Sequence, residues 1–125
     1  MIRTSSEETP YRTQFSNGKH ASISDSAPDK GGSGDGFRPH ELLEAALATC
    51  MNMAIRMCAR EHGIALTSVS TTVTLDRGKI DEACFRCVID LPEDLPPADR
   101  RRLIEAARLC SVHRTLSRKF TFQGP

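Results

Sequence analysis

The chain has 125 residues, with 17 Lys and Arg against 16 Asp and Glu and a formal net charge of +1. This length fits one domain, and the near-neutral balance gives no strong field that would attract nucleic acid or an anionic membrane surface. Hydrophobic residues make up 38% of the chain, so the core is modest and burial against a second copy is expected. We therefore expect a single domain over residues 1–125 that binds neither nucleic acid nor a membrane.

The start of the chain and its cysteines bear on the compartment. Residues 1–9 are polar and lack an apolar signal core, so we expect a loose N-terminus and a cytoplasmic protein. The longest apolar stretch is interrupted by Glu44, Asn52 and Arg56, and we do not expect it to span a membrane. The five cysteines are an odd number, which argues against a fully paired secreted framework.

The first third of the chain predicts a hairpin and a loop. Residues 11–15 and 20–24 are candidate strands on either side of a turn at 16–19, a pattern typical of a β-hairpin. The segment 25–38 contains four glycines and a proline, which predicts a flexible loop rather than a packed element. No Gly-Lys-Ser or Gly-Lys-Thr follows it, so it is not a phosphate-binding P-loop.

The clearest predicted helix begins at Pro39 and runs to about His62, with Gly63 as a natural residue to end it. Glu41 and Glu44 lie near its start, where the positive end of the helix dipole favours negative charge. Apolar residues cover most of its circumference, which predicts burial on most sides. In so short a chain this indicates a central helix wrapped by sheet, or the core of a dimer.

The remaining chain predicts two strands, a helix and a last short strand. Residues 67–75 and 83–91 alternate as strands around a turn, and residues 98–110 have helical spacing. Residues 119–122 are a candidate final strand. The resulting order, β-β-α-β-β-α-β, is typical of an α+β fold.

Two cysteines lie on the apolar faces of the two predicted helices, Cys50 in the middle of the first and Cys110 at the end of the second. If both helices face one core, their sulfurs can meet. A thiolate that attacks a peroxide becomes a sulfenic acid, and a second nearby thiol condenses with it to a disulfide. The alternative is that both thiols serve only as small buried hydrophobic side chains.

Two motifs in the sequence resemble those of a known family. Pro39 to Leu43, followed by Ala45 to Cys50, resembles the first cysteine motif of the OsmC/Ohr family, the osmotically inducible and organic hydroperoxide resistance proteins. The run from Cys110 to Leu116 resembles the second motif, which is usually Cys-Pro-Val. With the glycine-rich loop and the order of elements, the resemblance spans roughly residues 11–122.

The resemblance implies the OsmC-like fold, an intertwined homodimer in which sheets wrap two long central helices and the active sites lie at the interface. It also implies a stress-response peroxidase that reduces organic hydroperoxides, with Cys50 as the peroxidatic thiol and Cys110 as the resolving thiol. The electron donor would be a small or protein-bound dithiol such as a lipoyl group. No metal, flavin or other cofactor is implied.

Two departures from the family pattern concern the surroundings of the reactive thiol. Characterised members carry a Glu ten residues before the reactive Cys, whereas here that position is His40 and Glu41 stands nine before. The proline of Cys-Pro-Val is replaced by Ser111. These differences resemble a less characterised branch of the family.

Family members also use an Arg to stabilise the thiolate, and the resemblance offers Arg38 for that role, with Arg12 and Lys19 as further candidates. Glu41 would hold this cation. The alternative is that Arg38 is a solvated side chain of the loop. Nine helical residues correspond to about 900° of rotation, which places Glu41 on the face opposite Cys50. The alternative is that Glu41 serves only the helix dipole.

Two other functions compete with the peroxidase. One is a non-enzymatic OsmC-like dimer that binds a small apolar ligand or senses oxidants. The other is a zinc-stabilised module that uses Cys84 and Cys87. Positions i and i+3 of a strand point to opposite faces, which favours a structural role for these two cysteines.

Cys58 lies eight residues beyond Cys50, about 12 Å along a helix and too far for a disulfide.

Overall fold

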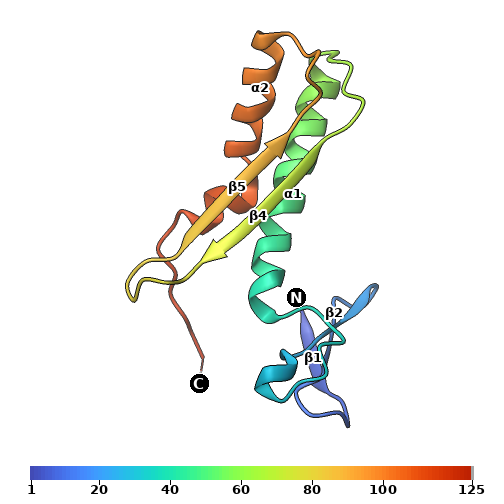
Figure 1. The fold of residues 1–125 in the computed structure, drawn as a ribbon, viewed down its shortest axis with the longest axis vertical. Helices are drawn as coiled ribbons and strands as arrows, with labels where there is room; N and C mark the ends of the chain where they lie inside the picture. The colour runs from blue at the N-terminus through green and yellow to red at the C-terminus, as the bar shows by residue number, and fades with distance from the viewer. Residues whose placement is uncertain (125) are drawn as a thin grey trace. The chain divides into compact units, whose positions relative to one another are not determined.

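The computed structural model describes residues 1–124 and shows the mixed α+β architecture that the sequence predicts (Figure 1). Contacts divide the chain into two compact units, Met1–Leu43 and the part from Glu44 onward. The first unit holds a small sheet and a loop. The second holds most of the long helix, a hairpin and two further helices. The hydrophobic core lies in the second unit.

The first unit is a three-stranded antiparallel sheet in the order β1-β2-β3, whose strands are β1 (Arg3–Ser6), β2 (Thr13–Ser16) and β3 (Ala21–Ser24). The predicted turn joins β2 to β3. The Asn17 side-chain oxygen accepts hydrogen bonds from the N–H groups of Lys19 and His20 at 2.9 and 2.8 Å. Gly18 has φ 94°, a left-handed conformation that glycine adopts without strain.

The prediction of a loose N-terminus over residues 1–9 is wrong, because Arg3–Ser6 forms strand β1. Its register pairs Arg3 with Ser16 and Ser6 with Thr13. All four residues of β1 are exposed, so the strand is held by backbone pairing rather than by a buried face. A strand of this kind carries no apolar alternation, and the sequence pattern does not reveal it.

The segment 25–38, expected to be a flexible loop, is held in place by hydrogen bonds to the carboxylate of Asp25. Asp25 is 2% exposed and accepts hydrogen bonds from the N–H groups of Ser26, Ser33 and Asp35 at 2.7, 3.0 and 3.2 Å. Burial acts to raise the pKa of Asp25, but these bonds and one from Gly34 outweigh it and hold the pKa below its ordinary value.

The same segment also folds back onto β3. The Phe37 N–H donates to Ile23 and the Asp25 N–H donates to Phe37, both at 3.0 Å. A short 3₁₀ helix, η1 (Pro28–Lys30), lies between these contacts. The loop is therefore ordered by backbone hydrogen bonds, which glycine content alone does not predict.

Helix α1 (Pro39–Glu61) begins and ends close to the predicted positions. Pro39 opens it, since its fixed φ suits the first helical turn. At the other end Gly63 has φ 64°, and the Ile64 N–H donates to the Ala59 carbonyl at 2.8 Å. This is a Schellman motif, which satisfies carbonyls left free at the helix end.

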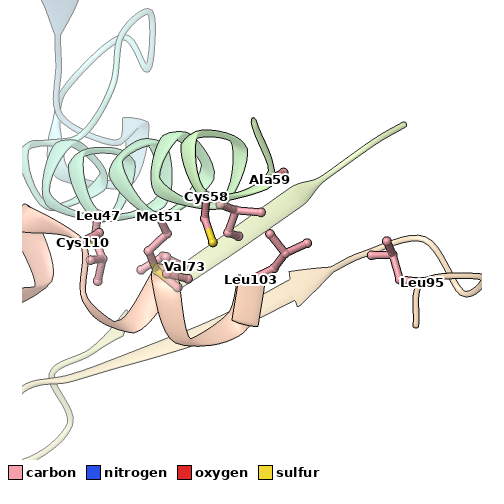
Figure 2. Close-up of a cluster of buried hydrophobic side chains, with 10 residues drawn as sticks. Leu47, Met51, Cys58, Ala59, Val73, Leu95, Leu103 and Cys110 are labelled. Atoms are coloured by element: carbon pink, nitrogen blue, oxygen red, sulfur yellow. The ribbon is translucent and has the colours of Figure 1, made fainter. Parts of the chain in front are cut away.

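One face of α1 forms the core with helix α2 (Pro97–Arg108) and with the hairpin of β4 (Ser70–Asp76) and β5 (Cys84–Asp90) (Figure 2). Leu47, Ile55 and Leu103 are the largest fully buried side chains. Met53 and Met57, on other faces of α1, are 52% and 61% exposed. The prediction that α1 is buried on most sides is therefore not met within one chain.

Helix α1 is the one helix in residues 1–124 that is long and apolar enough, by length and composition, to cross a membrane; its 18-residue window has mean hydropathy 1.3. Core helices of soluble proteins meet the same two criteria. Leu47, Met51 and Ile55 of this helix are buried against other elements of the chain. The absence of a membrane span stays a prediction.

The β4–β5 ribbon lies across α1 and α2 (Figure 1). Three polar bonds, which we call the α1–β4 clasps, join α1 to β4 and to Val69, the residue directly before β4. The Leu75 N–H donates to Glu44 at 2.7 Å, the Thr71 hydroxyl donates to the Ala48 carbonyl at 2.9 Å, and the Asn52 amide donates to the Val69 carbonyl at 3.2 Å. Together they fix the position of the hairpin along the helix.

The C-terminal part differs from the prediction in two ways. The second helix ends at Arg108, and a separate short helix, α3 (Ser111–Leu116), follows it, with Cys110 as its N-cap at φ −61° and ψ 149°. The predicted strand over 119–122 is wrong, since these residues form no strand. Phe120 and Phe122 alternate as strand residues do, but both are exposed.

Candidate active site

The structure brings the two predicted thiols together in the second unit. Cys50 is half-buried on α1, and Cys110 is buried at the junction of α2 and α3. The Cys110 side chain acts on the pKa of the Cys50 thiol, and Cys50 acts on the pKa of Cys110; both are free thiols. Because 60 residues separate them, their meeting depends on how α2 and α3 pack against α1.

The start of α3 supplies further partners to Cys50. The Val112 N–H donates to the Cys50 sulfur at 3.4 Å, and the Ser111 hydroxyl lies 3.4 Å from the same sulfur. In α3, N–H groups near the first turn have no partner within the helix, so Val112 is free to donate outward. The break between α2 and α3 at Cys110 makes these donors available.

These contacts favour the ionised form of Cys50. Burial acts to raise the pKa of its thiol, but hydrogen bonds from the Ser111 hydroxyl, the Val112 N–H, the Cys110 thiol and the Ser111 N–H outweigh burial and lower the pKa. The donors are neutral groups rather than cations. A thiolate is the nucleophilic form of cysteine, so Cys50 is the more reactive partner.

Cys110 behaves in the opposite way. Burial raises the pKa of its thiol, the His113 N–H lowers it, and the side chain and charge of Cys50 raise it further. The net effect is a pKa above the ordinary value. The pair therefore holds one thiol that ionises readily beside one that keeps its proton, which makes Cys50 the thiol that attacks first.

The predicted Arg38–Glu41 pair is formed in the first unit. The Arg38 backbone N–H donates to Glu41 at 3.0 Å and its Nε donates at 2.8 Å, with a further contact from Nη2. The backbone bond and the side-chain bonds from Arg38 lower the pKa of Glu41. Since Arg38 precedes the first residue of α1, this bond is also one half of a capping box. Both the functional and the capping interpretation of Glu41 fit this geometry.

Arg12 and Lys19, the two alternatives to Arg38 as the cation near Cys50, both lie in the first unit. Arg12 lies within 2.6 Å of Glu7 and 3.2 Å of Asp35, so it connects the strand region to the glycine-rich loop. Lys19 is exposed in the β2–β3 turn. These positions give Arg12 a structural function in the first unit, and the choice of the cationic partner of Cys50 stays a prediction.

A hollow of about 410 Å³ in the first unit lies beside the glycine-rich loop. It is lined by Ser22, Ile23, Gly34, Asp35, Gly36, Phe37 and Glu41. The lining combines two carboxylates, Asp35 and Glu41, with the apolar side chains of Ile23 and Phe37.

The remaining thiols lie apart from this chemistry. Cys84 and Cys87 are exposed on β5, and Cys58 is buried on α1. Burial and the charge of Cys84 raise the pKa of Cys87, the opposite of the shift at Cys50. In the part of the chain that the structure describes, no three His, Cys, Asp or Glu side chains gather to hold a metal ion. The zinc-module alternative therefore has no ligand set there.

Sequence reasoning identified Cys50 and Cys110 but missed Ser111 and Val112 as partners of Cys50. The available signal was the serine in place of the usual proline, which marks residue 111 as different. Ser111 reaches Cys50 because α2 ends at Arg108 and Cys110 caps the next helix, α3. The helical spacing of residues 98–110 continues past Arg108, so the sequence pattern does not reveal this break.

Comparison with solved structures shows the same fold in several bacterial proteins. An OsmC-like protein from Mycoplasma pneumoniae matches with a TM-score of 0.72 and 19% identity over 93% of this chain and 85% of its own. The organic hydroperoxide resistance protein OsmC from Legionella pneumophila matches with a TM-score of 0.66 and 20% identity over 94% and 88%. For the organic hydroperoxide resistance protein OhrB of Bacillus subtilis the values are 0.65 and 18%, over 94% and 89%.

At these identities the structures show a shared fold. No curated protein matches the chain. A family model described as OsmC-like protein matches residues 32–123, which include the end of the glycine-rich segment, the two thiols and the serine between Cys110 and Val112. The chain belongs to the OsmC-like protein family.

Proposed function

We propose that this protein is a thiol peroxidase that reduces organic hydroperoxides with Cys50 and Cys110. The observation that carries the proposal is the paired environment of the two sulfurs. Cys50 receives hydrogen bonds from the start of α3, and Cys110 lies against it with a raised pKa. Two of the structural relatives are named organic hydroperoxide resistance proteins, which supports the choice of substrate.

In the proposed reaction the Cys50 thiolate attacks the outer oxygen of the hydroperoxide. The O–O bond breaks, the alcohol leaves with a proton, and Cys50 becomes a sulfenic acid. The Cys110 sulfur then attacks the Cys50 sulfur, water leaves, and a disulfide forms. An external dithiol, such as a lipoyl group, returns two electrons and two protons and is itself oxidised to a disulfide. The reaction uses no metal or flavin.

The proposal includes a homodimer in the cytoplasm, with the exposed face of α1 covered by the second copy. Met53 and Met57 support it, because large apolar side chains left in water on one helix indicate an interaction surface. Arg38, held by Glu41, is the proposed cation of the site. Replacing Arg38 with Met tests that role, since loss of turnover with an unchanged fold is expected.

The direct test is consumption of cumene hydroperoxide by the reduced protein with dihydrolipoamide as reductant. Cys50→Ser should lose turnover, and Cys110→Ser should form the sulfenic acid but fail to form the disulfide. Cys84→Ser, which changes an exposed thiol on β5, is the matched control and should keep wild-type turnover. Full turnover in Cys50→Ser contradicts the proposal, and absence of turnover in the wild type favours the non-enzymatic dimer.

A further inference from the structure

Residue 111 is the place where this chain departs from Cys-Pro-Val, and the structure shows what serine adds there. A serine brings a hydroxyl and a backbone N–H, and a proline has neither. The Ser111 hydroxyl lies 3.4 Å from the Cys50 sulfur. The Val112 N–H donates to the same sulfur at 3.4 Å. The hydroxyl beside Cys50 would therefore be lost with proline.

The backbone itself does not require serine. Residue 111 is the first residue of α3, the helical position where proline is most readily accommodated. Cys110 before it has φ −61° and ψ 149°, the extended conformation that a residue preceding proline adopts. Since proline fits this backbone, the difference that serine makes to Cys50 lies in its hydroxyl.

We propose that Ser111 is a catalytic residue of this protein, whose hydroxyl donates to the Cys50 sulfur and holds it as a thiolate. The hydroxyl and the Val112 N–H are both neutral donors. Cys110 is the titratable group that acts on the Cys50 thiol, and its own pKa is raised, so it remains protonated where Cys50 ionises. The consequence for peroxide chemistry rests on the proposed function, whereas the effect on the thiol does not.

The sequence allows Cys50 to be followed alone. Trypsin cleavage after Lys and Arg, but not before Pro, places each of the five cysteines on a different peptide, and Cys50 lies on residues 31–56. Pulse alkylation with iodoacetamide across a range of pH, followed by mass spectrometry, gives a rate profile for each thiol. The Cys58 peptide, residues 57–60, reports whether a variant stays folded, because Cys58 is buried.

Three substitutions test the hydroxyl. Ser111→Thr keeps a hydroxyl at this position, whereas Ser111→Ala and Ser111→Pro remove it. The Cys50 profile should stay near its wild-type position in Ser111→Thr and move to higher pH in the other two variants. Loss of one charge-assisted bond lowers the thiolate population of Cys50 about tenfold. A thiolate of higher pKa is intrinsically more nucleophilic, which offsets part of this loss. Cys50 in Ser111→Ala should therefore be alkylated about threefold more slowly than in the wild type at neutral pH. Thr115→Ala is the matched control, since its hydroxyl bonds the Ser111 carbonyl at 3.0 Å and not the sulfur.

The outcomes separate this inference from the proposed function. A Cys50 profile in Ser111→Ala that matches the wild type, with Cys58 still protected, overturns the role of Ser111 even if peroxide turnover is found. A shifted profile with no turnover in the wild type supports Ser111 as a thiolate donor and contradicts the peroxidase. If Ser111→Pro does not fold, the comparison of Ser111→Ala with Ser111→Thr still decides the question.

Discussion

Leu103→Ala tests whether α2 is held on α1 as the structure describes. Leu103 is 0% exposed, whereas Leu109, the C-cap residue that follows the same helix, is 59% exposed. Removing three carbon atoms costs about 2.4 kcal/mol at about 0.8 kcal/mol for each buried carbon. The cavity left behind raises the loss to about 3–4 kcal/mol. For Leu109→Ala the same arithmetic, scaled by its smaller buried fraction, gives about 1 kcal/mol.

Urea unfolding followed by circular dichroism measures both variants against the wild type at one protein concentration, since association shifts apparent stability. The free energy of unfolding should fall about 3 kcal/mol for Leu103→Ala with an unchanged dependence on urea. The Cys50–Cys110 disulfide should also form more slowly, because α2 positions Cys110. Equal losses of unfolding free energy in Leu103→Ala and Leu109→Ala would refute the burial of Leu103 between α2 and α1.

Three further changes test other parts of the structure. Asp25→Asn should make the melting temperature fall less steeply in acid. The pKa of Asp25 in the folded protein lies below its ordinary value of 3.8. The ionised carboxylate therefore stabilises the fold fully above that value, and this contribution is lost as pH falls through the folded pKa. Equal losses between pH 5 and pH 3 in both proteins would contradict this. Met53→Glu should convert a dimer to a monomer in light scattering, whereas Ile80→Glu, at a side chain 98% exposed, should not. Gly36→Ala should lower the melting temperature, because its Cβ would lie 2.5 Å from the Ile23 carbonyl oxygen.

Helices and paired strands with clear periodicity could be predicted from the sequence. The apolar spacing and the flanking Pro39 and Gly63 predicted α1 to within one residue at its end. The alternation of β-branched residues predicted β4 and β5, although β4 begins later than expected, at Ser70. In each case the local signal and the tertiary packing agree, which is why the pattern is sufficient.

The elements that were missed depend on contacts that local patterns do not encode. Strand β1 is exposed and polar, and only its pairing with β2 makes it a strand. The break at Leu109 and Cys110 falls inside a continuous helical pattern. For the site, the two motifs predicted both thiols, but the donors on Ser111 and Val112 required the position of α3.

The α1–β4 clasps bear on the order in which the second unit folds. They join residues 17, 23 and 31 positions apart, from Asn52–Val69 through Thr71–Ala48 to Leu75–Glu44. Once the shortest loop has closed, each following bond adds only a few residues to a loop that already exists, so its entropic cost is small. Helix and strand can then close in succession from the Asn52 end. The Leu75 N–H, which donates to Glu44, is the backbone donor among the three, and it is expected to gain protection from hydrogen exchange late in refolding.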